Sequence, residues 1–311
     1  MKIIVIGDII EDNHYFCRSY KEIEENTKYA YKIEKEINSL GAAGNVANTI
    51  CSLLMEEQVD ILFFTSCNES TQIKILPLPR IQYTKHPTIV RNRYYTENEN
   101  LKWKLDLRID RYDDLYLKTS VNHKELTECI SRNDIIVISD YRKGFLSKDD
   151  IKKIISIGNK NKCKILVDTI ELDDCYKNCT YLQLKNINMR HYFRDHLKLE
   201  DWRTVERKFL IKEIAKNFNC NIIVTNSSDS IIYFDGKNIY SKKFYNPKQF
   251  SCSLGAGDAF LSGLAIAAYK NKKSIHDYVE IADKYATMST TFIGTTQLVN
   301  NKMIDQITLA T

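Results

Sequence analysis

Several well-known functional signatures are missing from the sequence. None of the nine cysteines forms a CxxC pair, so the spacing of a zinc site is absent. The 45 basic and 40 acidic residues are interspersed without a long basic block, and we therefore expect no nucleic-acid partner. No apolar stretch approaches the roughly 20 residues that span a membrane, and no GxxxxGKS or GxxxxGKT loop occurs. A P-loop is thereby excluded, and neither a cysteine zinc site nor a membrane-spanning helix is expected.

The cysteines and the N-terminal residues predict a cytoplasmic protein. The cysteines are odd in number and scattered, so a disulfide framework is not expected in a chain of 311 residues, and unpaired thiols suit a reducing cytosol. The first residues, MKIIVIGDIIED, place acids directly after a short apolar run without a small-residue cleavage site. They predict a first strand rather than a signal peptide.

Short β-branched runs alternate with stretches of helical periodicity along the chain. With 43% hydrophobic residues, the sequence can bury one large core or two modest ones. Continuous apolar strands separated by helices are typical of a parallel sheet covered on both faces, so we expect an α/β fold. Ser147, followed by Asp149 and Asp150, predicts a helix start. The expected strands lie at 2–7, 59–66, 134–140, 163–168 and 221–226, and the expected helices at 44–56, 147–160, 202–218 and 256–269.

Two segments, 13–38 and 84–112, interrupt this alternation. Both are rich in Tyr, Lys, Arg and Glu, and TIVRNRYY and LKWKLDLRID alternate as half-exposed strands do. Because the segments flank the first helix in sequence, we expect a small separate sheet that forms a lid over one end of the main sheet. An edge hairpin without a function is the alternative. No repeat or low-complexity linker occurs, so residues 1–311 are expected to form one domain with this lid.

The segment SLGAGDAFLSG (253–263) combines two glycines, one aspartate and the start of an apolar helix. Gly255 and Gly257 let backbone amides converge, and the helix N-terminus adds partial positive charge, so we predict an anion site. A carboxylate beside an anion is unfavourable unless it does chemistry, and Asp258 is suited to take a proton from an attacking hydroxyl. The alternative is an aspartate that only caps the helix. A dinucleotide fingerprint is excluded, because Phe260 occupies the position of its third glycine.

Other polar segments follow predicted strands or precede predicted helices. GDIIED places Asp8 and Asp12 after the first strand, LGAAGNVANTI places Asn45 at the opening of the first long helix, and SDYRKG ends the strand at 134–140. In open α/β sheets such turns share one edge, and ligands bind there. We therefore expect these segments beside the glycine turn.

Together these segments resemble the ribokinase/PfkB carbohydrate kinases. GAGDAF resembles the C-terminal signature of that family, and GDIIED and GAAGNVAN resemble its N-terminal sugar-binding segments. Within the family, LGAAGNVAN, SDYRKGFLS and TIVRNRYYTENENLKWKLD look most like the D-glycero-D-manno-heptose 7-phosphate kinases of lipopolysaccharide and surface-polysaccharide synthesis. The resemblance covers nearly the whole chain and implies a ribokinase-like three-layer α/β/α fold with a mainly parallel sheet and a small β lid. Since no nucleotidyltransferase domain follows, a stand-alone kinase is expected.

The resemblance also implies roles for individual residues. It makes Asp258 the catalytic base, and it assigns the transferred phosphoryl group to the backbone of Gly255, Ala256 and Gly257. Arg93 and Lys143 are candidates for the phosphate of the sugar, because a dianion needs paired cations. A solvated turn lysine is the alternative for Lys143. The residues expected to hold the sugar itself are Asp12, Gly41 and Asn45.

The metal surroundings depart from the family pattern. Asn186 stands where the family has an asparagine near the nucleotide phosphates and the metal, but Met189 replaces the carboxylate linked to magnesium. No protein ligand of a metal is therefore predicted, although ATP and Mg²⁺ remain implied. Cys252 and Leu254 replace the usual Asp and the usual Thr or Ser before the first signature glycine, which weakens the case for a monovalent-cation site.

The nucleotide surroundings are altered as well. In TNSSDS (225–230), Ser227 and Ser230 stand where many members carry glycines against the nucleotide. With Thr225, these serines are the expected nucleotide contacts besides Asn186. The segment DTIELDD (168–174) lacks the Lys that heptose kinases often place after its first aspartate, Asp168.

The resulting expectation is an ATP-dependent sugar kinase that acts on a phosphorylated heptose or a related bacterial sugar, without nucleic-acid or membrane partners and as a homodimer. A degenerate homologue that binds sugar or nucleotide as a regulatory subunit is the competing interpretation, favoured by Met189 and Cys252. A kinase for another small alcohol, such as a nucleoside, is a third.

Overall fold

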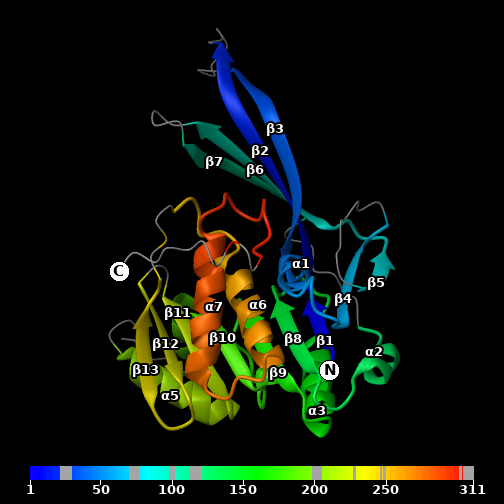
Figure 1. The fold of residues 1–311 in the computed structure, drawn as a ribbon, viewed down its shortest axis with the longest axis vertical. Coiled ribbons are helices and arrows are strands. Elements are labelled where there is room, and N and C mark those ends of the chain that lie inside the picture. Colours follow the sequence, from blue (N-terminus) through cyan, green and yellow to red (C-terminus); the bar gives the residue numbers. More distant parts are fainter. Residues whose placement is uncertain are drawn as a thin grey trace.

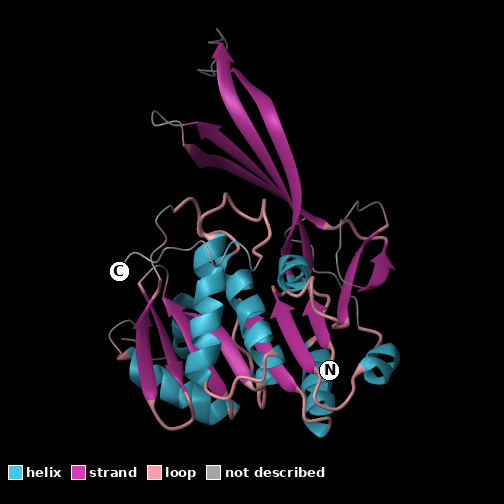
Figure 2. Ribbon diagram, viewed as in Figure 1, coloured by secondary structure: helices cyan, strands magenta, loops and turns pink. Residues whose placement is uncertain are grey.

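A nine-stranded, mostly parallel sheet with helices on both faces forms the body of the computed structural model, and a four-stranded sheet projects from one end (Figures 1 and 2). This is the expected α/β architecture with a lid. None of the described helices is long and apolar enough to cross a membrane. The structure describes residues 1–21, 30–69, 78–97, 102–112, 121–197, 205–226, 229–245, 247, 250–300 and 303.

The main sheet is parallel except at one edge, where β12 pairs antiparallel with both β11 and β13. β1 lies in its interior between β4 and β8, so the first strand of the chain is flanked on both sides. In spatial order the strands are β13 (Ile239–Lys243), β12 (Ser230–Phe234), β11 (Asn221–Asn226), β10 (Tyr181–Lys185), β9 (Lys164–Thr169), β8 (Ile135–Asp140), β1 (Ile3–Gly7), β4 (Ile61–Asn68) and β5 (Leu78–Thr84).

Each face of the main sheet has its own apolar core, which explains the continuous apolar strands. In β1, Ile3 and Val5 join the core under α1, α6 and α7, whereas Ile4 and Ile6 join the core under α2, α3, α4 and α5. Side chains alternate along a strand, so a strand buried on both faces needs an apolar residue at every position. The helices are α1 (Ala43–Leu53), α2 (His123–Cys129), α3 (Lys148–Lys160), α4 (Asn186–Leu197), α5 (Arg207–Phe218), α6 (Ala256–Tyr269) and α7 (Ile275–Ser289), with a short 3₁₀ turn η1 (Asp174–Tyr176).

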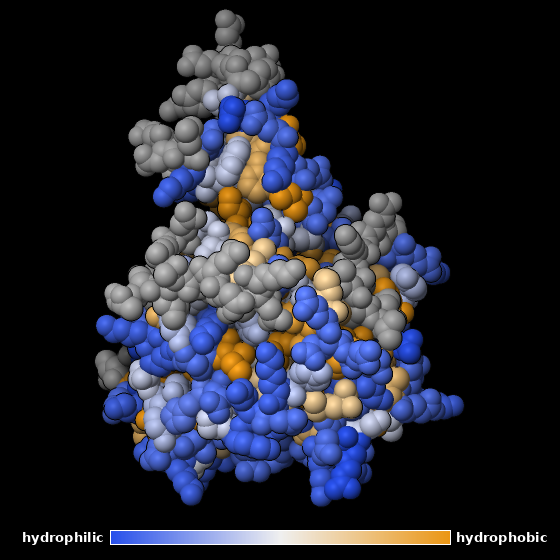
Figure 3. Space-filling view, in the orientation of Figure 1, coloured by the Kyte–Doolittle hydropathy of each residue, from blue (hydrophilic) through white to orange (hydrophobic). Residues whose placement is uncertain are grey.

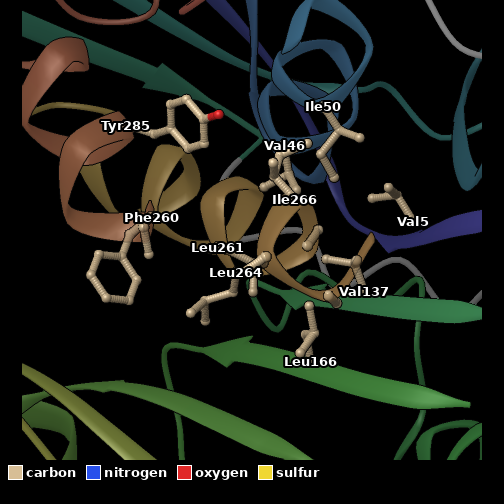
Figure 4. Close-up of a cluster of buried hydrophobic side chains, with 14 of the residues drawn as sticks. Val5, Val46, Ile50, Val137, Leu166, Phe260, Leu261, Leu264, Ile266 and Tyr285 are labelled. Atoms are coloured by element: carbon tan, nitrogen blue, oxygen red, sulfur yellow. The ribbon is translucent and has the colours of Figure 1, made fainter. Parts of the chain in front are cut away.

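Helix α6 lies at the centre of the first core and carries the glycine turn at its N-terminus. Its side chains pack between Val46 and Ile50 of α1 and the strand residues Val137 and Leu166 (Figure 4). Gly263 lets α6 approach α7 closely, because an added Cβ would lie 2.5 Å from the Cα of Ala282. Tight packing on all sides fixes the position of the helix start.

The lid sheet has the strand order β3-β2-β6-β7, with β2 and β6 parallel and the other pairs antiparallel. Its long hairpin rises beyond the main body in Figure 1. Because β2 starts two residues after β1 ends, and β3 runs directly into α1, the base of the lid lies beside the carboxyl edge of the main sheet. Its strands are β2 (Ile9–Lys21), β3 (Ala30–Ala42), β6 (Ile89–Glu97) and β7 (Trp103–Arg111).

A buried polar cluster joins the lid to the loop after α7. The two ring nitrogens of His14 lie 3.0 Å from the Tyr95 hydroxyl and 3.2 Å from the Thr295 hydroxyl, and Ser39 Oγ lies 2.7 Å from Thr295 Oγ1. Burial, helped by the charge of Arg93, lowers the pKa of His14 to about 4. The neutral imidazole therefore holds the lid by hydrogen bonds rather than by charge.

The predicted elements correspond to observed ones with small shifts of their bounds. The strand expected at 59–66 is β4 (Ile61–Asn68), and the helix expected at 202–218 is α5 (Arg207–Phe218). Ser147 caps α3 in a reciprocal pair with Asp150, as predicted. The lid strands extend beyond the expected segments, since β2 begins at Ile9 and β3 continues to Ala42.

Candidate active site

Asp258 lies in the first turn of α6 with 3% of its surface exposed. The Asn45 amide donates a hydrogen bond to its Oδ2 at 3.0 Å, and the Tyr141 hydroxyl donates one to its Oδ1 at 2.9 Å. These partners come from α1 and from the loop after β8, so three separate segments meet at one carboxyl group. Two carboxylate oxygens accept about four hydrogen bonds, which leaves room for the hydroxyl of a ligand.

The pKa of Asp258 is raised to about 6. Burial is the largest cause, while the hydrogen bonds from Asn45 and Tyr141 and the charge of Lys185 oppose it. The group is therefore ionised at neutral pH and yet more basic than an ordinary aspartate, which is the property that a general base needs.

The glycine turn, Gly255 to Gly257, begins with a residue in the left-handed conformation. Gly255 caps α6 with φ +82°, a conformation that side chains rarely adopt. A Cβ on Gly255 would also meet Asn45 Nδ2 at 3.2 Å, whereas a Cβ on Gly257 would have Gln183 Nε2 as its only neighbour, at 3.8 Å, among the described atoms. Ala256 is the first helical residue between them. The turn thus presents amides at the start of α6, and no described side chain crowds Gly257.

Asp8 holds the SDYRKG loop in place. Its carboxylate accepts backbone hydrogen bonds from Tyr141, Lys143 and Phe145 at 2.9–3.2 Å. Burial and the nearby Asp140 raise the pKa of Asp8 to about 7, although these three hydrogen bonds oppose the shift. The loop that carries Tyr141 and Lys143 is therefore tied to the end of β1.

Asp12 and Arg93 form a buried ion pair at the base of the lid. Arg93 Nη2 lies 3.0 Å from Asp12 Oδ1, and 1% of the Arg93 surface is exposed. Arg93 Nε has no hydrogen-bond partner within the described part of the chain. Gly41 makes space for the carboxylate, because an added Cβ would lie 2.5 Å from Asp12 Oδ2. The two residues expected to bind the sugar and its phosphate thus lie against each other, on the lid side of Asp258.

The candidate nucleotide residues lie on the other side of Asp258, toward β11 and β12. Thr225 pairs in register with Lys185 of β10, and Ser230 begins β12. Asn186 opens α4, and its buried Oδ1 has no hydrogen-bond partner among the described residues. A buried acceptor without a partner is costly, so a ligand donor or cation beside Asn186 is favoured. Ser227 lies outside the described residues.

The positions that depart from the family pattern do not form a metal site. Met189 is fully buried in the core under α4 and α5, where no ligand reaches it. Cys252 Sγ accepts the backbone hydrogen bond of Leu254, and Leu254 packs near Gly294. The described residues contain no group of three or more His, Cys, Asp or Glu side chains that could hold a metal ion. Met189 therefore offers no ligand to a metal ion.

Several residues beside Asp258 have no predicted role in the sequence patterns. Tyr141 is one, and only its place within SDYRKG signals it. Gln183 donates its amide to the Gly257 carbonyl at 3.1 Å, and Asp168 is buried at the end of β9 with a pKa that burial and Asp258 raise to about 7. The short β10 that carries Gln183 and Lys185 matches no apolar run among those expected.

Known proteins with this fold are numerous and distant in sequence. Phosphofructokinase-2 from Escherichia coli superposes with a TM-score of 0.71 at 14% identity, covering 99% of this chain and 98% of that one. Ribokinase from Thermotoga maritima gives a TM-score of 0.66 at 13% identity, with 98% of each chain covered. These likenesses establish the ribokinase-like fold.

Sequence relatives lie at about one quarter identity. The bifunctional protein HldE from Sulfurimonas denitrificans is 26% identical over 295 residues, which are 93% of this chain and 59% of that protein. An uncharacterized sugar kinase from Buchnera aphidicola is 24% identical over 311 residues, with 97% and 94% covered. The chain thus spans about three fifths of the HldE protein and nearly the whole length of the Buchnera relative.

The match to a family model defines the class of protein, a phosphotransferase with an alcohol as acceptor. The chain belongs to the pfkB family of carbohydrate kinases, whose model matches residues 106–302 and therefore more than half of its length.

Proposed function

We propose that the protein transfers the γ-phosphoryl group of ATP to a hydroxyl of a phosphorylated heptose or a related sugar, for surface-polysaccharide precursor synthesis. The observation that carries this proposal is Asp258, a buried carboxylate at the start of α6 beside the glycine turn, held by Asn45 and Tyr141. The pfkB family supplies the reaction class.

The proposed reaction uses Asp258 as the base. The acceptor hydroxyl gives its proton to Asp258 while its oxygen bonds to the γ-phosphorus, and the bond from phosphorus to the leaving oxygen of ADP breaks. Amides of the turn at Gly255, Ala256 and Gly257 stabilise the charge on the transferred group. Phosphoryl transfer depends mainly on such positioning and charge stabilisation.

A phosphorylated acceptor is favoured by the cations on the lid side. Arg93 is buried and carries a guanidinium nitrogen without a protein partner among the described residues. Lys143 lies in the loop that Asp8 anchors, next to Tyr141. We propose that both meet the sugar phosphate and that Asp12 and Asn45 hold sugar hydroxyls. A heptose is favoured by the resemblance of LGAAGNVAN and SDYRKGFLS to heptose 7-phosphate kinases.

ATP is proposed to lie toward β11 and β12, near Asn186, Thr225 and Ser230. Magnesium would enter with the ATP phosphates and keep several waters, which is its common coordination in proteins. Since Met189 cannot bind it, we assign no step to a protein-bound metal.

The exposed apolar side chains of the lid favour pairing with a second copy of the chain. Tyr31 and Ile33 of β3 and Leu107 and Ile109 of β7 are 43–50% exposed. Figure 3 shows apolar side chains among charged ones on the lid. We propose a homodimer formed by the lids, in the cytoplasm, where ATP and reduced thiols coexist.

A non-catalytic homologue is the second candidate function. It is favoured by the burial of Met189, which removes a carboxylate from the metal surroundings, and by Cys252. Such a protein would bind sugar phosphate or ATP as a regulatory subunit and transfer no phosphoryl group.

ATP consumption against a panel of heptose and hexose phosphates separates the two. We expect turnover of about 1–100 per second on at least one member. Thermal unfolding of the same mixtures reports binding, since a ligand at 100 times its dissociation constant stabilises by about 2.7 kcal/mol. Binding without turnover across the panel would establish the regulatory alternative, and the absence of both would overturn both proposals.

A further inference from the structure

Strand β10 directs alternate side chains to the two faces of the main sheet. Tyr181 and Gln183 point toward α6 and α7, since Tyr181 packs against Tyr278 of α7 and Gln183 bonds to the Gly257 carbonyl. Lys185 is two residues beyond Gln183 and therefore lies on the same face, about 6.6 Å closer to the carboxyl edge. It thus follows the residue that touches the glycine turn.

The neighbours of Lys185 on this face come from the adjacent strands. Gln183 is in register with Asp168 of β9, and Lys185 is in register with Thr225 of β11. The charge of Lys185 lowers the pKa of both Asp168 and Asp258, as expected for a cation on the same face of the sheet. The side chain of Lys185 is exposed and makes no ion pair or hydrogen bond within the described part of the chain.

The segment after Asp168 supplies no cation at this place. The residues that follow Asp168 are Thr169, Ile170 and Glu171, and Met189 is sealed in the opposite core. Asn186, next to Lys185, carries the buried oxygen without a partner. An exposed lysine and an unsatisfied polar group therefore directly follow the strand residue that contacts Gly257.

We infer that Lys185 contacts the phosphoryl group that is transferred and stabilises its charge where other kinases rely on a carboxylate-bound metal. The inference rests on the proposed kinase function. Lys185 gives up no proton: it donates hydrogen bonds from its ammonium to phosphoryl oxygens while Asp258 takes the proton of the acceptor. An ammonium on a flexible stem can follow the phosphorus from donor to acceptor.

Binding and turnover of the variants Lys185→Ala, Lys185→Gln and Lys185→Arg test this inference. Calorimetric titration with ATP and with adenosine separates contacts to the phosphates from contacts to the nucleoside. We expect both neutral variants to lose about tenfold in ATP affinity with unchanged adenosine binding, and about 10²-fold in kcat. Lys185→Arg should recover a large part of both. Lys212→Ala, which removes an exposed lysine of α5 on the opposite face, is the matched control.

The pH profile adds a readout that a structural role would not change. Asp258 is faced by Tyr141, Asp12, Asp168 and Lys185, and of these Lys185 is the cation. Removing it should raise the pKa of Asp258 and move the acidic limb of kcat to higher pH. An unchanged limb in the neutral variants would contradict a contact between this charge and the reacting groups.

The outcomes distinguish the inference from the proposed function. If the wild type is an active kinase and both neutral variants bind and turn over ATP as it does, the inference is wrong and the kinase remains. If the wild type transfers no phosphoryl group but binds ATP more tightly than the neutral variants do, the proposed kinase function is wrong and the contact between Lys185 and the phosphates stands. If the wild type binds ATP no better than adenosine, the inference is overturned.

Discussion

At the scale of single residues, the proposed chemistry depends on Asp258 and the two donors that hold it. Replacing Asp258 by Asn keeps the shape of the side chain but removes the basic oxygen to which we assign the proton transfer. We expect Asp258→Asn to lose 10²–10⁴-fold or more in kcat, the usual cost of a lost general base, since Asn45 and Tyr141 still fix the side chain. ATP and sugar binding should change little. Steady-state kinetics with calorimetric binding provide the measurement.

The control for this variant is Asp149→Asn in the exposed first turn of α3, which should behave as the wild type. In the wild type, kcat should fall as the pH drops through about 6, because the base is then protonated. Near-normal turnover of Asp258→Asn would show that another group takes the proton.

The residues of this site were predictable to different degrees. Asp258 and Asn45 follow directly from the GAGDAF and GAAGNVAN patterns, and the structure places them 3.0 Å apart. Tyr141 and Lys185 were not predictable, because a tyrosine in a turn and a lysine at a strand end have no distinctive spacing. The burial of Met189 was not predictable from the sequence and became visible only in the structure. A carboxylate introduced there would be buried without a partner, at a cost of several kcal/mol.

At the scale of elements, the lid exposes apolar side chains that favour contact with a second copy of the chain. Leu107 and Ile109 lie two residues apart on β7 and point to the same face, 50% and 43% exposed. Exchanging both for Lys puts two charges into the proposed dimer interface. We expect the double variant to be monomeric and folded at concentrations where the wild type is a dimer, as measured by sedimentation and circular dichroism.

Asp106→Lys is the matched control, because it adds a lysine at an exposed polar position of the same strand. It should leave the association of the chain unchanged. A wild type that sediments as a monomer would overturn the proposed homodimer.

Elements with a strong period were predictable, and short ones were not. β1, β8 and β9 are buried on both faces, so their apolar runs are continuous and their bounds shift by only one residue. β10 has only five residues, with a polar Gln183 in its middle, and α4 follows it without a break. The segment therefore shows neither a continuous apolar run nor a clear helical period. The lid was predictable from its alternation, because its strands are only half-buried.

At the scale of the whole molecule, carboxyl groups gather in the interior. Burial raises the pKa of Asp8 and Asp168 to about 7 and that of Asp258 and Asp283 to about 6. Three of these four lie at the carboxyl edge of the main sheet, where several chain segments meet. Ionising these buried carboxyl groups at neutral pH therefore lowers the stability of the folded protein.

This cost gives the ligand-free protein an unusual pH dependence. A carboxyl group whose pKa is higher in the folded state binds more protons there than in the unfolded chain, so stability is greatest below the unfolded pKa and is lost as the pH rises through the folded value. His14 opposes this only below about pH 6.5, because its pKa is lowered. We therefore expect the melting temperature to fall between about pH 6 and about pH 8, where Asp8 and Asp168 ionise. Differential scanning calorimetry across this range provides the measurement, and Asp168→Asn should flatten the decline while Asp149→Asn should not. A melting temperature that rises over the same range would mean that these carboxyl groups are already ionised in the folded protein.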